Sequence, residues 1–366
     1  MNVGKAESHP QVQPATLAGR DLSLRKAWAG RRVLVVGDVI ADEYVIGRPE
    51  RISREAPVLI LREESRQIIP GGAGNTAQNL AALGAEPLLV SVVGDDPAGA
   101  SLQEALQAAG ISTSGLIEEK ERLTFVKTRV LAGDRQAVRQ QVVRLDRGTA
   151  APATSWLQDQ VRERVQALLP TAEAMVFSDY GLGLLEPSLV AECIAQGSRL
   201  GIPIVADSRY RLLAYKGVTV ATPNQVEAGE ALGVSLDDDA AVVSAGWELI
   251  RRLASPALLI TRGAQGMDLF VQPNWHWRIP AMDPADVFDV TGAGDTVTAT
   301  LALALAAGSQ WPWAALLANV AAGLVVRKMG TRTVSSAEVE TALAEWKEGA
   351  SWWPLEAKSE RNRRPS

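Results

Sequence analysis

The string DVTGAGD at residues 289–295 has the strongest arrangement for chemistry, because two glycines and an aspartate directly precede an apolar helical run. The backbone N–H groups of Gly292, Ala293 and Gly294 can converge on one point at a helix start, where the helix dipole also favours negative charge. Asp295 then lies beside this anion site, where it can accept a proton from a hydroxyl attacking a phosphoryl group. An aspartate N-cap in an ordinary glycine-rich turn explains the same string.

A second glycine cluster, PGGAGN, also precedes a helical stretch. Close backbone approach at Gly71 and Gly72, together with the Asn75 amide, suits a polyhydroxy ligand, and no lysine follows as a P-loop requires. A plain loop is equally compatible. Asp38 closes the first predicted strand and Asp42 follows it. A carboxylate at the carboxyl edge of a parallel sheet can accept hydrogen bonds from sugar hydroxyls, although Asp42 also fits a solvated loop charge.

The string TPNQVE follows a predicted strand and opens a helix. Asn224 is a natural N-cap and Glu227 is its N3 partner, so a capping box explains the pair. The functional interpretation is that both face a phosphate and its hydrated Mg²⁺, which prefers a carboxylate and several waters. Thr261 and Gly263 end another strand in a glycine-containing turn that could lie against a nucleotide.

Composition restricts the chemistry. The 366 residues carry 37 Lys and Arg against 42 Asp and Glu, a net charge of −5 that argues against nucleic acid as the main partner. The single cysteine, Cys193, excludes a disulfide scaffold or a cysteine-rich zinc site and fits a reducing compartment. The two histidines, His9 and His276, leave carboxylates as the expected catalytic bases.

A membrane span is not expected. No charged residue occurs from 296 to 326, but GSQWP divides the stretch into apolar pieces at 298–307 and 313–326. Each piece is too short to cross a bilayer, so we expect two buried helices joined by a turn. The N-terminal residues have no apolar core of the signal-peptide type, which predicts a cytoplasmic enzyme.

The elements that must position these residues alternate along the chain. Short apolar strands separated by helices predict an α/β fold with a mostly parallel sheet covered on both faces. We expect strands at 31–38, 87–93, 174–178, 202–207, 218–222 and 257–261, and helices at 75–83, 99–109, 154–169, 188–200, 225–232 and 241–254.

Two segments interrupt this alternation, at about 44–63 and 124–146. Both have the alternating charge of strands with one wet face, so they could pair into a small sheet over the main one. The polar ends predict an N-terminal tail at 1–30 and a C-terminal tail at 346–366. One domain, residues 31–345, remains between them.

Taken together, the motifs resemble the ribokinase-like (PfkB-type) carbohydrate kinases over roughly residues 31–345. These kinases have a three-layer α/β sandwich with a mostly parallel central sheet and a small β-sheet lid. The resemblance is closest to D-glycero-β-D-manno-heptose 7-phosphate kinases, the N-terminal half of a bifunctional ADP-heptose synthesis protein. It is carried by VVGDVIADEY, RISREAPV, PGGAGNTAQNLAALGA, VRLD, SDYG, TPNQVE, VFDVTGAGDT and KMGTRTVS.

The resemblance implies roles position by position. Asp295 matches the catalytic base, which would deprotonate the anomeric hydroxyl as it attacks the γ-phosphate of ATP, and Glu227 matches the Mg²⁺-associated position. The remaining matches are an anion hole at Gly292, Ala293 and Gly294; a nucleotide side at Asn224, Gln225, Val226, Glu227, Thr261, Gly263 and Asn319; and a sugar side at Asp38, Gly71, Gly72 and Asn75, with the lid residues Lys127, Arg129 and Arg144 for a substrate phosphate.

The chain departs from the heptose kinases at three points. Leu182 stands where they usually have lysine, and Ser208-Arg209 stands where they usually have Pro-Lys. Arg209 keeps the charge but changes its geometry. No His-x-Gly-His string is present, so adenylylation would need a separate adenylyltransferase.

The expected reaction is phosphorylation of heptose 7-phosphate to the 1,7-bisphosphate, with ATP and Mg²⁺, for ADP-heptose and lipopolysaccharide core precursors. A kinase for another sugar or nucleoside is the alternative within this class, and a non-catalytic sugar- or nucleotide-binding relative is the alternative outside it. The resemblance also implies a homodimer formed through the lid.

Overall fold

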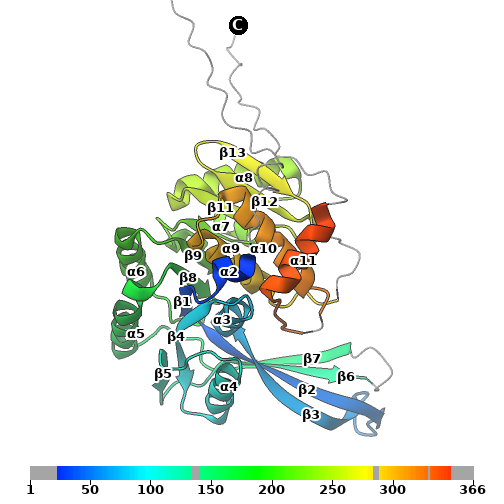
Figure 1. The fold of residues 1–366 in the computed structure, drawn as a ribbon. Helices are drawn as coiled ribbons and strands as arrows, with labels where there is room; N and C mark the ends of the chain where they lie inside the picture. Colours follow the sequence, from blue (N-terminus) through cyan, green and yellow to red (C-terminus); the bar gives the residue numbers. More distant parts are fainter. Residues whose placement is uncertain (1–22, 134–139, 283–287, 329, 348–366) are drawn as a thin grey trace, which may run out of the picture.

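A mixed sheet forms the centre of the molecule (Figure 1). The computed structural model describes residues 23–133, 140–282, 288–328 and 330–347. Within them nine strands pair in the order β13-β12-β11-β10-β9-β8-β1-β4-β5, and only β12 and β13 run antiparallel to their neighbours. The strands are β1 (Arg32–Gly37), β4 (Glu86–Gly94), β5 (Leu116–Glu119), β8 (Ala174–Asp179), β9 (Ile204–Ser208), β10 (Val220–Ala221), β11 (Ala257–Thr261), β12 (Met267–Val271) and β13 (Trp275–Ile279).

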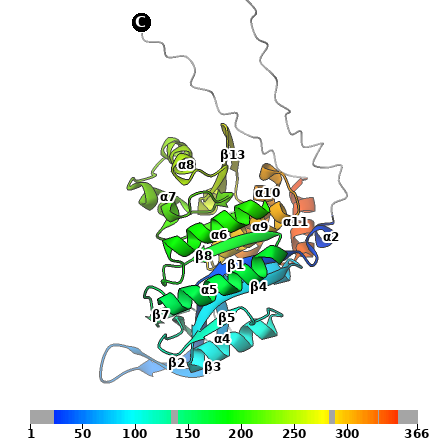
Figure 2. The same cartoon turned by 90° about the vertical axis from the view of Figure 1, so that its left-hand side faces the viewer.

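Helices cover both faces of this sheet (Figure 2). Strand β1 shows why: Val33 and Val35 pack into one apolar cluster while Leu34 and Val36 pack into the other, so all four are fully buried. One face carries α2 (Leu24–Trp28), α3 (Ala73–Ala82), α4 (Pro97–Ala108), α9 (Ala293–Ala306), α10 (Trp311–Val325) and α11 (Ser336–Lys347); the other carries α5 (Ser155–Leu168), α6 (Pro187–Leu200), α7 (Gln225–Leu232) and α8 (Asp239–Leu253).

A second, smaller sheet extends from one end of the main one, as the sequence predicts (Figure 1). It contains β2 (Val39–Ile52), β3 (Leu59–Gly72), β6 (Val126–Ala132) and β7 (Gln140–Arg147) in the order β3-β2-β6-β7. We call these four strands the lid. Strand β2 continues from β1 through Asp38 alone, and β3 leads directly into α3, so the lid is joined to the site-bearing elements without long linkers.

The observed bounds of some elements match the predicted ones and those of others differ, in each case for a local reason. Helix α7 coincides with prediction because a capping box starts it and Gly233, at φ 70°, ends it. Helix α9 begins at Ala293, so the glycine-rich string adjoins it and Asp295 lies in its first turn, as the string predicts. Helix α2 lies inside the expected N-terminal tail, yet Trp28 in it is only 1% exposed.

The charge-poor stretch folds as α9 and α10, as predicted. Among the residues the structure describes, no helix has the length and apolar character needed to cross a membrane.

Candidate active site

Asp295 lies in the first turn of α9 and is buried, with 3% of its surface exposed. Three side chains donate hydrogen bonds to its carboxylate. Asn75 Nδ2 is 2.7 Å from Oδ2, Tyr180 Oη is 2.9 Å from Oδ1, and Thr76 Oγ1 is 3.3 Å from Oδ1. Asn75 and Thr76 belong to α3 and Tyr180 follows β8, so two separate parts of the fold hold the carboxylate of α9.

A polar seam between α3 and α9 holds these donors in place. Asn79 Nδ2 donates to Asn75 Oδ1 at 3.2 Å, and Thr296 Oγ1 donates to Asn79 Oδ1 at 2.9 Å. Asn75 is fully buried and both ends of its amide are used within the protein. In this structure Asn75 therefore orients Asp295, and the predicted contact of Asn75 with a sugar stays a prediction.

Burial raises the pKa of Asp295 to about 6. The hydrogen bonds from Asn75 and Tyr180 oppose this rise, and the negative charge of Asp42 adds to it. At neutral pH the carboxylate is mainly ionised and still basic enough to accept a proton, which is the range a general base needs.

The predicted anion hole begins at Gly292, whose φ of 80° lets the chain turn into α9. A Cβ at this position would lie 2.5 Å from Asn75 Nδ2, so glycine is also required by the close approach of α3. The Ala293 amide donates to Val290 O at 3.2 Å. Within the described residues the amides of Gly292 and Gly294 have no acceptor, and Gly294 is exposed, so these two remain available for an anion.

Asp38 and Tyr180 follow the neighbouring strands β1 and β8, where the strand order reverses direction along the chain. Such a point is where open α/β sheets bind ligands. Asp38 Oδ2 accepts hydrogen bonds from the amides of Tyr180 and Leu182, each at 3.0 Å. Asp38 thus fixes the turn that carries Tyr180, and its predicted role in sugar binding stays a prediction. Burial raises the pKa of Asp38 to about 6.

The lid contributes a charged face beside Asp295. Asp42 on β2 accepts a hydrogen bond from Arg129 Nη1 at 2.6 Å, and Thr331 Oγ1 lies 3.4 Å from its other oxygen. The same carboxylate requires glycine at position 71, because a Cβ on Gly71 would lie 2.4 Å from Asp42 Oδ2. Gly72 has φ 59° and passes close to the Asp38 carbonyl. Both glycines therefore serve the junction between the lid and the main sheet.

The three predicted lid cations have different surroundings. Arg129 is buried against Asp42, and Arg144 is exposed and paired in a bidentate manner with Asp146 on the same strand. Lys127 Nζ lies 5.1 Å from the centre of the Tyr180 ring. Burial lowers the pKa of Lys127, and Asp42 opposes that change. Of the three, Lys127 is the one placed next to the contacts of Asp295.

A cleft of ≈ 1150 Å³ opens at the carboxyl ends of β9, β10 and β11. Its lining contains most of the predicted nucleotide side, namely Asn224, Gln225, Val226, Glu227, Thr261 and Gly263. Arg209 and Tyr210 line it as well. Asn319 does not belong to the lining: it is buried in α10 and donates to the Pro280 carbonyl at 2.8 Å.

The capping box that the sequence allows is present in the cleft wall. Asn224 Oδ1 accepts from the amides of Val226 and Glu227 at 2.9 Å, and Glu227 Oε2 accepts from the Asn224 amide at 2.9 Å. Glu227 is partly buried, and burial raises its pKa. The cap and a ligand role are compatible, because Glu227 lines the cleft while its Oε2 accepts from the Asn224 amide.

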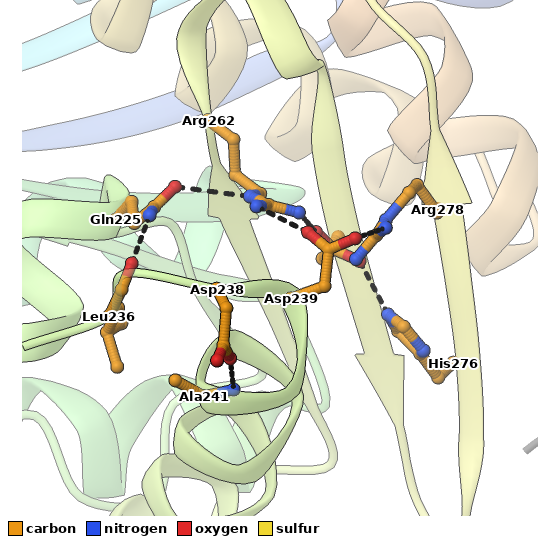
Figure 3. Close-up of polar contacts among 9 residues, drawn as sticks. Gln225, Leu236, Asp238, Asp239, Ala241, Arg262, His276 and Arg278 are labelled. Carbon is orange, nitrogen blue, oxygen red and sulfur yellow. Dashed lines mark hydrogen bonds and ion pairs between the residues drawn. The ribbon is translucent and has the colours of Figure 1, made fainter.

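Figure 3 shows an ion network behind this wall, centred on Arg262. Arg262 donates to Gln225 Oε1 at 3.2 Å, to Asp268 Oδ2 at 2.9 Å and to Asp239 Oδ1 at 2.8 Å. Gln225 in turn donates to the Leu236 carbonyl, which is part of the cleft lining. The network thus connects β12, α7 and the start of α8 around the cleft. His276 and Arg278 of β13 complete it through Asp268 and Asp239.

Sequence reasoning missed three residues that the structure places at the site. Tyr180 and Thr76 donate hydrogen bonds to Asp295. The sequence signal for Tyr180 was the motif SDYG that contains it, and the signal for Thr76 was the motif PGGAGN that it follows. Asp207 approaches the start of α9, because a Cβ at Gly294 would lie 3.9 Å from Asp207 Oδ2. Burial raises the pKa of Asp207, and the charges of Asp295 and Glu227 raise it further.

No group of three or more His, Cys, Asp or Glu side chains in the described part of the chain could hold a metal ion alone. Mg²⁺ commonly binds through one or two carboxylates and substrate phosphates, so the donor set of Asp207 and Glu227 fits that ion. The mutual repulsion of these carboxylates would be relieved by a divalent cation.

A base that is ionised at neutral pH beside free helix-start amides is what phosphoryl transfer to a hydroxyl requires, and the chain is accordingly a phosphotransferase. It belongs to the pfkB family of carbohydrate kinases, whose model matches residues 31–338.

Curated relatives include proteins named bifunctional protein HldE. The one from Citrifermentans bemidjiense is 43% identical over 309 residues, covering 84% of this chain and 62% of the relative. The one from Paramagnetospirillum magneticum is 43% identical over 86% of this chain and 63% of the relative. The chain thus spans less than two thirds of the length of these relatives.

Solved structures share the fold. Arabidopsis thaliana ribokinase complexed with ribose and ATP has 20% sequence identity and a TM-score of 0.66, over 86% of this chain and 99% of that one. Escherichia coli phosphofructokinase-2 in complex with substrates and products has 19% identity and a TM-score of 0.69 over the same shares. The predicted ribokinase-like fold is confirmed.

Proposed function

We propose that this chain uses ATP to phosphorylate the anomeric hydroxyl of D-glycero-β-D-manno-heptose 7-phosphate, giving the 1,7-bisphosphate for ADP-heptose synthesis. The observation that carries the proposal is the position of Asp295. It is buried, held by three donors and adjacent to available amides, at the place where the lid meets the nucleotide side of the sheet. The sequence strings typical of the heptose branch and the similarity to HldE proteins support heptose 7-phosphate as the substrate.

In this mechanism Asp295 takes the proton from the attacking hydroxyl. Asn75 and Thr76 keep the carboxylate aimed at the acceptor, so little reorganisation is needed when the reaction occurs. The amides of Gly292 and Gly294 stabilise the charge that develops on the transferring phosphoryl group. Exclusion of water by the lid strengthens these contacts.

ATP would occupy the ≈ 1150 Å³ cleft. Val226, Val234 and Leu236 in its lining offer apolar contact for a planar base, and Arg209 offers positive charge for phosphates. Glu227 and Asp207 would hold Mg²⁺. When bound, this ion neutralises charge on the phosphates of the donor.

The departures from the heptose kinases affect the grip on a substrate phosphate. Leu182 is buried and supplies no charge. Ser208 donates to Asp179 at 2.9 Å, which leaves Arg209 exposed beside it. Arg209 lines the nucleotide cleft, and Lys127 lies beside the Tyr180 ring. Lys127 would then be the lid cation available for the 7-phosphate, while Arg209 serves the phosphates of ATP.

The acceptor is tested by measuring ADP release from purified protein with heptose 7-phosphate, ribose, fructose, fructose 6-phosphate and nucleosides. We expect the highest kcat/KM with heptose 7-phosphate. Release with ribose or fructose but not with heptose 7-phosphate would establish the alternative sugar kinase.

Asp295→Asn provides the matched control for catalysis. A general base contributes about 10²- to 10⁴-fold, so we expect kcat to fall by that factor with an unchanged melting temperature. A rate within a fewfold of wild type would show that Asp295 is not the base. Binding of ATP and sugar without turnover by the wild-type protein would establish the non-catalytic alternative.

We also propose that the protein acts in the cytoplasm as a homodimer formed through the lid, with a separate adenylyltransferase acting later in the pathway. The dimer is supported by the outer lid strand, β7, where Val142, Val143 and Leu145 are 49%, 44% and 58% exposed. Apolar side chains this exposed on neighbouring positions favour an interface.

A further inference from the structure

Tyr180 lies between the lid and Asp295, and it contacts both. Its phenol oxygen donates to Asp295 Oδ1 at 2.9 Å, and Lys127 Nζ lies 5.1 Å from the centre of its ring. Its backbone amide donates to Asp38 Oδ2 at 3.0 Å. The main chain of Tyr180 is thus anchored to the sheet, while its side chain links a lid strand to the carboxylate.

The two side-chain contacts reinforce one another chemically. A cation within about 6 Å of an aromatic ring centre is attracted to the ring face. The positive charge of Lys127 also draws electron density from the phenol, which makes its hydroxyl a stronger donor. A stronger donor stabilises the ionised form of Asp295, the form that can accept a proton.

We propose that Tyr180 is a positioning residue that couples the lid to the catalytic base: with Lys127 over its ring, its phenol orients the Asp295 carboxylate toward the acceptor hydroxyl. The inference rests on the proposed role of Asp295 as the base. It adds a lid-dependent control of that base.

The charged groups that face Asp295 are few. Asp42 comes from β2, Asp207 from β9 and Lys127 from β6. Helices α3 and α10, which pack against α9, contain no ionisable residue. Asp42 is paired with Arg129, and Asp207 is coupled to Asp295 by repulsion, so the tests below use substitutions that leave both of these carboxylates in place.

The first test is Tyr180→Phe, which keeps the ring and its cation contact and removes only the hydroxyl. We expect the acidic limb of the kcat–pH profile to move upward by about one pH unit, since one donor to the ionised carboxylate is lost. The KM for ATP should stay unchanged. A purely structural role would lower the melting temperature and leave the limb in place, which would overturn the proposal.

Tyr215→Phe is the matched control, because its phenol donates to the carboxylate of Asp179 at 2.7 Å, away from Asp295. It should leave the acidic limb at the wild-type pH. Replacement of Tyr180 by 3-fluorotyrosine, a stronger donor of the same shape, should move the limb downward. This second variant keeps the test decisive if Tyr180→Phe does not fold, and an unmoved limb would overturn the proposal.

The lid coupling is tested by Lys127→Met alone and combined with Tyr180→Phe. If Lys127 acts through the phenol, its substitution moves the limb upward in the wild type and by less in the Tyr180→Phe background. Equal shifts in both backgrounds would show that Lys127 acts independently. Asp295→Asn separates the two levels: full activity there refutes the base itself, whereas an inactive Asp295→Asn with an unmoved Tyr180→Phe limb refutes only the coupling.

Discussion

Asp295 shows how opposing local effects set the strength of a base. Burial raises the pKa of its carboxyl group to about 6, and hydrogen bonds from α3 and from the turn after β8 oppose that rise. The same donors fix its orientation. One set of hydrogen bonds thus supplies both the charge state and the geometry that proton transfer needs.

The pH dependence of the wild-type enzyme follows from this value. Asp295 must be ionised to accept a proton, so kcat should fall as the pH drops through about 6, approaching a tenfold loss for each further unit. The pH dependence of kcat is measured from steady-state ADP release between about pH 5 and 8 at saturating substrate concentrations. A rate that stays constant down to pH 5 would contradict the assignment.

Gly292→Ala tests the close packing of α3 on the anion site. The left-handed φ of 80° and the approach of Asn75 Nδ2 to 2.5 Å both oppose a methyl group, so we expect a large loss of kcat and a lower melting temperature. Gly308→Ala is the matched control, because Gly308 has φ 78° and nothing within 4 Å of its Cβ position. It should cost only about 1 kcal/mol of stability. Equal effects of the two substitutions would show that contact with Asn75 is unimportant.

At the scale of elements, the site is made where strand ends meet two helix starts. The end of β10 lies beside the end of β11 through an isolated bridge between Asn224 and Thr261, and Thr222 is joined to Thr298 of α9 by a 2.9 Å hydroxyl contact. The cleft wall and the helix that carries Asp295 are therefore in direct contact.

Arg262→Met tests how far the network behind the cleft determines nucleotide binding. The change leaves the fully buried Asp268 with fewer partners and releases Gln225, so we expect a several-fold higher KM for ATP and a stability loss of about 3 kcal/mol. Arg251→Met removes an exposed ion pair on α8 and should change either quantity little. Thermal melting and ATP titration measure both, and an unchanged KM for ATP in Arg262→Met would argue against the role.

The sequence was sufficient for those elements whose signals are local. The parallel strands other than β5, the bounds of α7 and the small sheet follow from apolar runs, a capping box and alternating charge. It was insufficient for β12 and β13, which are antiparallel edge additions, and for α2, whose burial of Trp28 depends on distant partners.

The same limit applies to the candidate site. Glycine strings indicated where a chain turns and a ligand could approach, but they did not show which side chain meets Asp295. Tyr180 and Asp207 come close to it only through the pairing of β8 and β9, and Asn319 points away from the cleft for reasons of helix packing.

At the scale of the whole molecule, the lid sheet and the main sheet are two bodies joined at one edge. β2 continues from β1 and β3 leads into α3, and Asp42 and Tyr44 of β2 also contact Thr331, which follows α10. On the lid, β7 is exposed along its whole length. An exposed outer strand with apolar side chains is suited to a second copy of the chain.

Leu145→Glu tests the proposed dimer. A carboxylate on β7 should weaken association through the lid, so light scattering after size exclusion should show a monomer where the wild type is a dimer. Leu200→Glu, at a 50% exposed position on α6, is the control and should remain dimeric. A dimer that persists in Leu145→Glu would show that the interface lies elsewhere. A monomeric wild type would refute the proposed dimer.

The seam between α3 and α9 also governs when the enzyme becomes competent during synthesis. Asn75 and its partner Asp295 are 220 residues apart in the chain. Helix α3 therefore leaves the ribosome long before α9, which packs on it, and the face of α3 that meets α9 stays open until then. Contacts of such high sequence separation form slowly, so the active centre is among the last parts of the protein to mature.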